Sequence, residues 1–183
     1  RVQLVADAFL ALAALMRVQM RQFGGGGPDG EGAEASLLTG ELVRRHAALA
    51  DQLQSARDVV LESPRTARRQ RLAGMLVLAL EMRDHLLACE LDLDTLQSHP
   101  GQAPVLRGLQ ALLREMARDV VRLADALLLG RTPPPVPDRR ARLAELRWSA
   151  DAGLPPGQGG GPSPQLLARA LADRMGHNSD ELQ

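Results

Sequence analysis

Apolar residues recur at three- and four-residue steps along most of this chain, which is the spacing of amphipathic α-helices. The pattern predicts a first helix over Val2–Phe23 and a second over Ser36–Glu62, separated by a glycine-rich loop that has nothing with which to build a core. The apolar stripe of the first helix consists of Val2, Val5, Phe9, Leu12, Met16 and Phe23. The inward face of the second is expected to hold Leu38, Leu42, Leu49, Leu53, Ala56 and Val60.

Two further long helices follow from the same spacing. The third is predicted to begin at Ser63–Pro64, an N-cap residue followed by proline at the first helical position, and to end near Gln97. Its apolar face consists of Leu72, Met75, Leu76, Ala79, Met82, Leu86 and Leu93. The fourth, Pro104–Leu129, stops at Gly130, a favourable C-cap residue, and carries three heptads of a and d positions. These positions are Leu106, Leu109, Leu113, Met116, Val120, Leu123 and Leu127.

The C-terminal part of the chain is predicted to form shorter helices. A stiff polyproline-type connector, 132–137, precedes a short helix over Asp138–Ala150, and a Gly/Pro-rich loop then leads to a helix over Ser163–Met175. We therefore expect an all-α fold, a bundle of about four long helices with a shorter helical appendage. We expect one domain over 1–183, in which 1–130 form the main bundle and 131–183 the linker and shorter helices.

The two ends of the chain suggest that it is excised from a longer protein. It opens at Arg1–Gln3 already inside an amphipathic pattern. It closes on Asn178 and Glu181, which resemble the capping box at the start of another helix.

Composition excludes several classes of protein. The 22 basic residues, all of them arginine, balance 22 acidic ones, and this zero net charge argues against a dedicated nucleic-acid binder. A single cysteine excludes an internal disulfide framework and a four-cysteine zinc site. No run of about 18 apolar residues is present, so we expect no membrane span within these residues.

Candidate chemistry concentrates in the third helix. Glu81, His85 and Cys89 follow one another at four-residue steps, as metal ligands along one helix would. Against a metal site, no second helix offers a matching Glu-x-x-His, and a solvated charged face is the ordinary alternative, which we favour. No nucleophile motif accompanies Cys89, so we expect neither enzyme activity nor a cofactor.

Three polar residues lie on or near the predicted apolar stripes. Arg83 and Glu90 need partners if they are buried. His46 shares the stripe of Leu53 and Val60, so it is either a proton switch or, as we favour, a core-edge histidine with a hydrogen-bond partner.

Arginines gather at two places. Arg65, Arg68, Arg69 and Arg71 open the third helix, where positive charge opposes the helix dipole, so they are candidates for contact with anionic lipid headgroups or an acidic partner. Along the back of the fourth helix, a second candidate surface consists of Arg107, Arg114, Arg118 and Arg122. A solvated surface balanced by neighbouring acids is the favoured alternative for both.

Several segments, taken in order, resemble one family. The stretch 5–17, Val-Ala-Asp-Ala-Phe-Leu-Ala-Leu-Ala-Ala-Leu-Met-Arg, is similar to the opening of a soluble domain in the fusaric acid resistance (FUSC, YccS-like) inner-membrane proteins. The glycine loop, the arginine-rich start of the third helix, the helix ending at 121–127 and the helix at 165–171 follow in the same order. One departure is 86–91, Leu-Leu-Ala-Cys-Glu-Leu, where relatives tend to carry a Ser/His/Tyr-rich stretch.

The resemblance implies a non-catalytic domain on the cytoplasmic face of the bacterial inner membrane. It would lie between two transmembrane halves of an efflux transporter for aromatic acids or related toxic compounds, with a regulatory or assembly role. Implied partners are those transmembrane halves, a second copy of the chain and anionic lipid headgroups, but not nucleic acid. The alternatives are a free-standing helical scaffold or adaptor, and a bundle that senses a metal or other ligand through Glu81, His85 and their neighbours.

Overall fold

The computed structural model confirms an all-α architecture. It describes residues 1–24, 31–61, 66–97 and 100–151, and the described part contains helices and connecting segments without strands. The elements are α1 (Val2–Gly24), α2 (Glu31–Leu61), α3 (Ala67–Gln97), the 3-10 turn η1 (Pro100–Gln102), α4 (Ala103–Leu129) and α5 (Arg140–Asp151). The helix predicted over Ser163–Met175 and the closing capping box lie outside the described residues, and the division into bundle and appendage stays a prediction.

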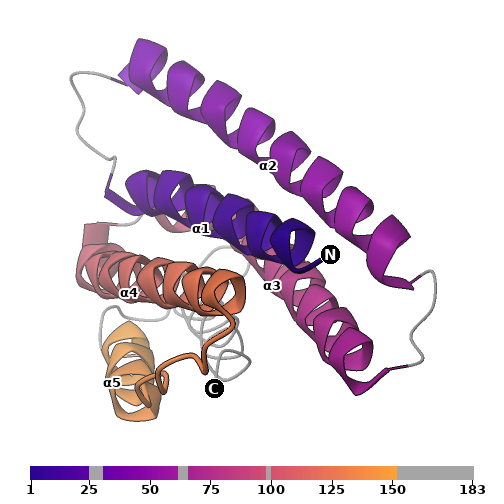
Figure 1. Cartoon of the computed structure of the whole chain (residues 1–183). Coiled ribbons are helices and arrows are strands. Elements are labelled where there is room, and N and C mark those ends of the chain that lie inside the picture. Colours follow the sequence, from indigo (N-terminus) through magenta and orange to yellow (C-terminus); the bar gives the residue numbers. More distant parts are fainter. Residues whose placement is uncertain (25–30, 62–65, 98–99, 152–183) are drawn as a thin grey trace.

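Helix α1 is the central helix of the bundle. It packs against α2, α3 and α4, and Figure 1 shows it running between α2 on one side and α4 on the other, with α3 crossing behind. The predicted stripe is buried, but so are Ala6, Ala8, Ala13 and Leu15, which do not belong to it. Alanine has no bulk beyond Cβ, so the neighbouring helices approach α1 closely on more than one side.

One helix of the described part is long and apolar enough to cross a membrane by length and composition, a test that the expectation of no membrane span did not foresee it passing. Val2–Phe23 passes that test with a mean hydropathy of 1.5, although 56% of its most apolar window is buried inside the fold. The charges of Asp7 and Arg17 do not lower the average enough to exclude it. The core helix of a soluble protein satisfies the same test, and the three helices packed around α1 supply it with an apolar environment.

Helices α2 and α3 present the predicted rows to the core. Leu49, Leu53 and Ala56 of α2 are buried, and the row on α3 extends through Cys89 to Leu96. The start of α3 differs from the prediction: it begins at Ala67, where the hydroxyl Oγ1 of Thr66 accepts a hydrogen bond from the backbone N–H of Arg69 at 3.4 Å. Ser63 and Pro64, the predicted start, lie outside the described residues.

The ends of α1 and α4 are fixed by specific hydrogen bonds. Gln110 of α4 donates from Nε2 to the backbone carbonyl of Met20 at 3.1 Å, and Gln97 of α3 donates to the carbonyl of Gln22. Such side-chain donors satisfy carbonyls near a helix end. Gly130 ends α4 as predicted, with a φ of 63° that glycine adopts without steric penalty.

The burial of α1 predicts a large difference between two identical substitutions. Leu12→Ala removes a side chain that is 0% exposed, whereas Leu37→Ala on α2 removes one that is 72% exposed. We expect the first to lower the free energy of unfolding by about 2–5 kcal/mol, because it leaves a cavity in the core. The second should change it by less than about 0.5 kcal/mol. Urea titration followed by circular dichroism measures both, and similar losses would contradict this packing.

Candidate functional site

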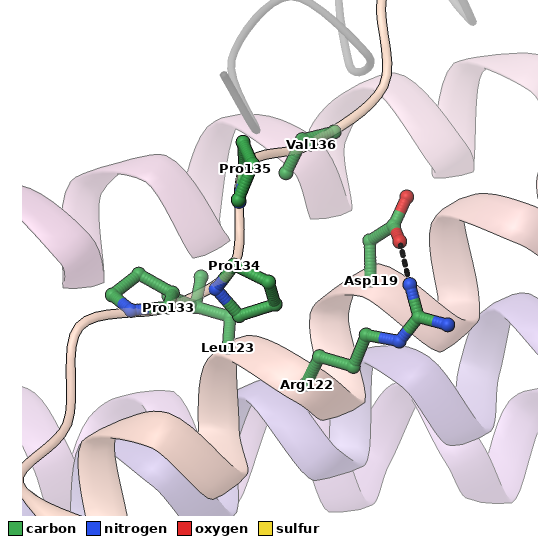
Figure 2. Close-up of a pocket in the computed structure, with 7 residues that line it drawn as sticks. All are labelled: Asp119, Arg122, Leu123, Pro133, Pro134, Pro135 and Val136. Carbon is green, nitrogen blue, oxygen red and sulfur yellow. Dashed lines mark hydrogen bonds and ion pairs between the residues drawn. The ribbon is translucent and has the colours of Figure 1, made fainter.

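The proline-rich linker runs back along α4. Pro133, Pro134 and Pro135 are exposed, while Val136 packs against the hydrophobic core. Figure 2 shows the linker passing over one face of α4. Between the two lies a surface pocket lined by Asp119, Arg122, Leu123, Pro133, Pro134, Pro135 and Val136. The predicted connector, residues 132–137, therefore lies along α4, and we call it the strap.

A buried ion pair anchors the end of this strap. The guanidinium of Arg139 donates to the carboxylate of Asp119, and their side chains are only 5% and 6% exposed. Arg139 also donates to the carbonyl of Pro137 and to Glu115, each at 3.4 Å. Arg122 reaches the other oxygen of Asp119 at 3.4 Å, the contact drawn in Figure 2. Two cations thus face one buried carboxylate.

A second pair extends the contact to α5. Arg142 donates from Nη1 to Glu115 at 2.5 Å. Partial burial raises the pKa of Glu115, but the hydrogen bonds from Arg142 and Arg139 outweigh it, so that the pKa lies below its ordinary value of 4.5. We call the four residues Glu115, Asp119, Arg139 and Arg142 the α4–α5 clasp.

Apolar contacts also hold α5 against α4. Leu143 is buried in the core, and Leu146 lies against Gly108 of α4. A Cβ atom at Gly108 would approach the Cδ2 of Leu146 to 2.2 Å, so glycine permits this close approach. The carboxylate of Asp138 accepts a hydrogen bond from the N–H of Arg140 at 2.9 Å and fixes the start of the helix.

The candidate metal ligands of α3 do not converge. Glu81 is exposed, His85 is half-buried and Cys89 is completely buried. Each four-residue step rotates a position by about 40° around the helix, so two steps carry Cys89 from the solvent side into the apolar row. Within the described residues, no group of three or more His, Cys, Asp or Glu side chains is placed to hold a metal ion. The described residues therefore give the weak metal candidates no support beyond their spacing.

The interpretation of His46 as a core-edge histidine agrees with the structure. His46 Nε2 and Glu90 Oε1 lie 2.6 Å apart, and both side chains are mostly buried between α2 and α3. The expectation that a buried Glu90 needs a partner is thus met. Arg83 donates to the adjacent carboxylate of Asp84 at 2.7 Å.

The arginine surfaces are placed as follows. Arg68 and Arg71 of α3 are exposed and Arg69 is half-buried, while Arg65 lies outside the described residues. On α4, the exposed arginines are Arg107, Arg114, Arg118 and Arg122, and Arg122 also contacts Asp119 of the clasp. A role in binding a lipid or a partner stays a prediction for both surfaces.

Sequence reasoning missed the clasp. Asp119 is one of the neighbouring acids that were expected to balance the exposed arginines of α4, and no sequence pattern indicated a role for Arg139. A signal was present: Glu115 and Asp119 share a face of α4 at four-residue spacing, and Arg139 and Arg142 lie three residues apart at the start of α5. The pairing of these two faces depends on the path of the linker, which a local pattern does not show.

The clasp joins carboxylates to guanidinium groups that are always protonated, so its acidic side chains are engaged in ion pairs. What it does is attach α5 to α4 through charge-assisted hydrogen bonds. By its fold and site, the protein is a helical bundle in which the short helix α5 is attached to α4 by the clasp.

The comparisons with known proteins then give the family. A family model described as FUSC-like inner membrane protein yccS matches residues 2–152, which include α1 through α5. The chain belongs to this family of membrane transporter-type proteins. No curated protein and no solved structure matches the chain.

The buried pair predicts a strong effect of one substitution. Asp119→Asn keeps the side-chain shape but leaves the buried charge of Arg139 without its main counter-ion, which should weaken the seating of α5 by about 3 kcal/mol or more. Arg122→Gln removes only a partner that is 60% exposed and should cost less than about 1 kcal/mol. Hydrogen exchange of the α5 amides measures both variants. Equal exchange rates in the two would show that the pair does not hold α5.

The lowered pKa of Glu115 predicts a pH dependence of α5 seating. Because the folded-state pKa lies below 4.5, the stabilisation from Glu115 is fully present above that pH and is lost as pH falls through the folded value. Glu41, whose pKa is lowered by a hydrogen bond from Arg21, titrates in the same window. Unfolding free energies of wild type and Glu115→Gln, measured from pH 7 to pH 3, should converge on acidification. A constant gap would contradict the assignment.

Proposed function

We propose that the chain is a non-catalytic cytosolic domain of a FUSC-type exporter of aromatic acids or related toxic compounds, with a regulatory or assembly role. The family match over residues 2–152 carries this proposal, since the family is one of inner-membrane proteins. The burial of α1 supports a domain outside the bilayer, because the apolar surface of this helix is covered by α2, α3 and α4.

The regulatory role rests on the clasp. Helix α5 is held to α4 by a small set of ion pairs and by Leu143 and Leu146, while the bundle itself is held by an extended apolar core. A contact of this size is weaker than the core and can change without unfolding the bundle. In this proposal, the position of α5 relative to the bundle regulates the activity of the transporter.

The location is tested by cysteine labelling of the full-length transporter in cells. The buried Cys89 is replaced by alanine, and a single cysteine is placed at Gly40, where an added Cβ meets nothing within 4 Å. We expect a membrane-impermeant maleimide to label this cysteine in inverted membrane vesicles but not in intact cells. Labelling in intact cells would place the domain on the periplasmic side and reject the proposal. The parent with only Cys89 should stay unlabelled while folded.

The regulatory role is tested by comparing Asp119→Asn with Arg122→Gln in the full-length protein. If α5 position controls export, Asp119→Asn should reduce fusaric acid efflux several-fold, while Arg122→Gln leaves it near the wild-type rate. Membrane levels of the two variants, measured by immunoblot, serve as the control for folding. Normal efflux by Asp119→Asn, with α5 shown by hydrogen exchange to be released, would reject the role of the clasp while leaving the cytosolic location intact.

A further inference from the structure

Four exposed arginines lie along the seam between α1 and α4. They are Arg17 of α1 and Arg107, Arg114 and Arg118 of α4, and we call them the seam patch. The three on α4 follow at seven- and four-residue steps, so they share one face of that helix. None of the four forms an ion pair with the residues that the structure describes.

Contacts across the seam bring Arg17 to this face. Gln110 donates to the carbonyl of Met20 at 3.1 Å, and Nε of Arg114 lies 3.3 Å from the sulfur of the same residue. The two helices run in opposite directions (Figure 1), so the turn after Arg114 on α4 lies beside the turn before Met20 on α1. Those turns carry Arg118 and Arg17 respectively. We therefore treat the four arginines as one patch that spans two helices.

Acidic residues around the patch are mostly engaged elsewhere. Glu115 and Asp119 are held in the clasp, on the neighbouring face of α4. Glu41 lies 2.6 Å from Arg21 and also pairs with Arg45. Asp125, seven residues beyond Arg118, is exposed at the far end of the same face. Asp7 of α1 is half-buried and accepts a hydrogen bond from Gln3. The four exposed guanidinium groups outnumber the carboxylates of Asp125 and Asp7, although the whole chain is neutral.

We infer that the seam patch docks the domain on the anionic headgroups of the membrane, an inference that rests on the proposed cytosolic location. Guanidinium groups donate paired hydrogen bonds to phosphate oxygens, and each arginine near an anionic surface adds to binding. The fully buried centre of a protein interface is depleted of charged residues, whereas these side chains are all charged. The family is one of inner-membrane proteins, so such a surface lies close to the domain.

The structure changes which arginines carry this role. Arg122 is exposed like the other arginines predicted on α4, but it pairs with the carboxylate of Asp119 beside the clasp, so we leave it out of the patch. Arg17 joins Arg114 and Arg118 instead, although it lies about 100 residues away along the chain. The separate group at the start of α3 is independent of the seam patch and supplies a control.

The test is co-sedimentation of the purified 183-residue chain with vesicles of phosphatidylcholine and phosphatidylglycerol, compared with pure phosphatidylcholine. Binding should appear only with the anionic lipid and should weaken steeply between 50 and 500 mM salt, as the Debye length shortens from roughly 14 Å to 4 Å. The triple variant Arg17→Gln, Arg114→Gln, Arg118→Gln should bind about tenfold to a hundredfold more weakly. Circular dichroism confirms that the variant is folded.

A matched triple variant, Arg44→Gln, Arg57→Gln, Arg71→Gln, removes the same charge from exposed positions on α2 and α3 and should retain most of the binding. Equal loss in both triples would show that net charge alone is responsible and would overturn the inference. Absence of binding at low salt would overturn it too, as would a self-association in analytical ultracentrifugation that the first triple abolishes. Labelling of the Gly40→Cys variant tests the cytosolic location by itself. That location can therefore be supported even if the seam patch does not bind lipid.

Discussion

The covering of α1 is the constraint on which the rest of the structure depends. This helix is apolar enough to cross a membrane, and exposing it to water would be costly. Three helices close around it, and its alanines let them approach: Ala6, Ala8 and Ala13 are all buried. Once α2, α3 and α4 are placed in this way, the directions of their outer faces are fixed. The clasp and the seam patch both occupy faces that α1 leaves free.

Helix α4 separates two kinds of charge on neighbouring faces. One face places Glu115 and Asp119 against Arg139 and Arg142, where low solvent exposure strengthens charge-assisted hydrogen bonds. The next face exposes Arg114 and its neighbours to solvent. There, the distance over which the charges act depends on the salt concentration. The same residue types therefore serve an internal attachment on one side and, in our proposal, an external contact on the other.

Much of the fold was predictable because helical periodicity is a local property. Most of the rows on α2, α3 and α4 are buried as the spacing indicated, the half-buried exceptions being Leu38, Met75, Leu123 and Leu127, and Gly130 ends α4 as expected. One feature of the prediction failed for a physical reason: α3 begins at Ala67, where the hydroxyl of Thr66 accepts a hydrogen bond from the N–H of Arg69, and not at Ser63–Pro64. The favoured solvated face of α3 does not extend to Cys89, which belongs to the core.

By itself, the sequence determined the all-α class, the inward face of each long helix and the need of Glu90 for a partner, because these follow from residue type and helical repeat. Only the tertiary structure decided which partner that is, His46, and which acids the arginines meet. Asp119 and Arg139 are separated by a turn and a proline strap, and the packing of α1 against α4 is what lets our proposal group Arg17 with Arg118. Long-range pairing depends on the path of the backbone, and that path is set by the collective burial of the core rather than by any single segment.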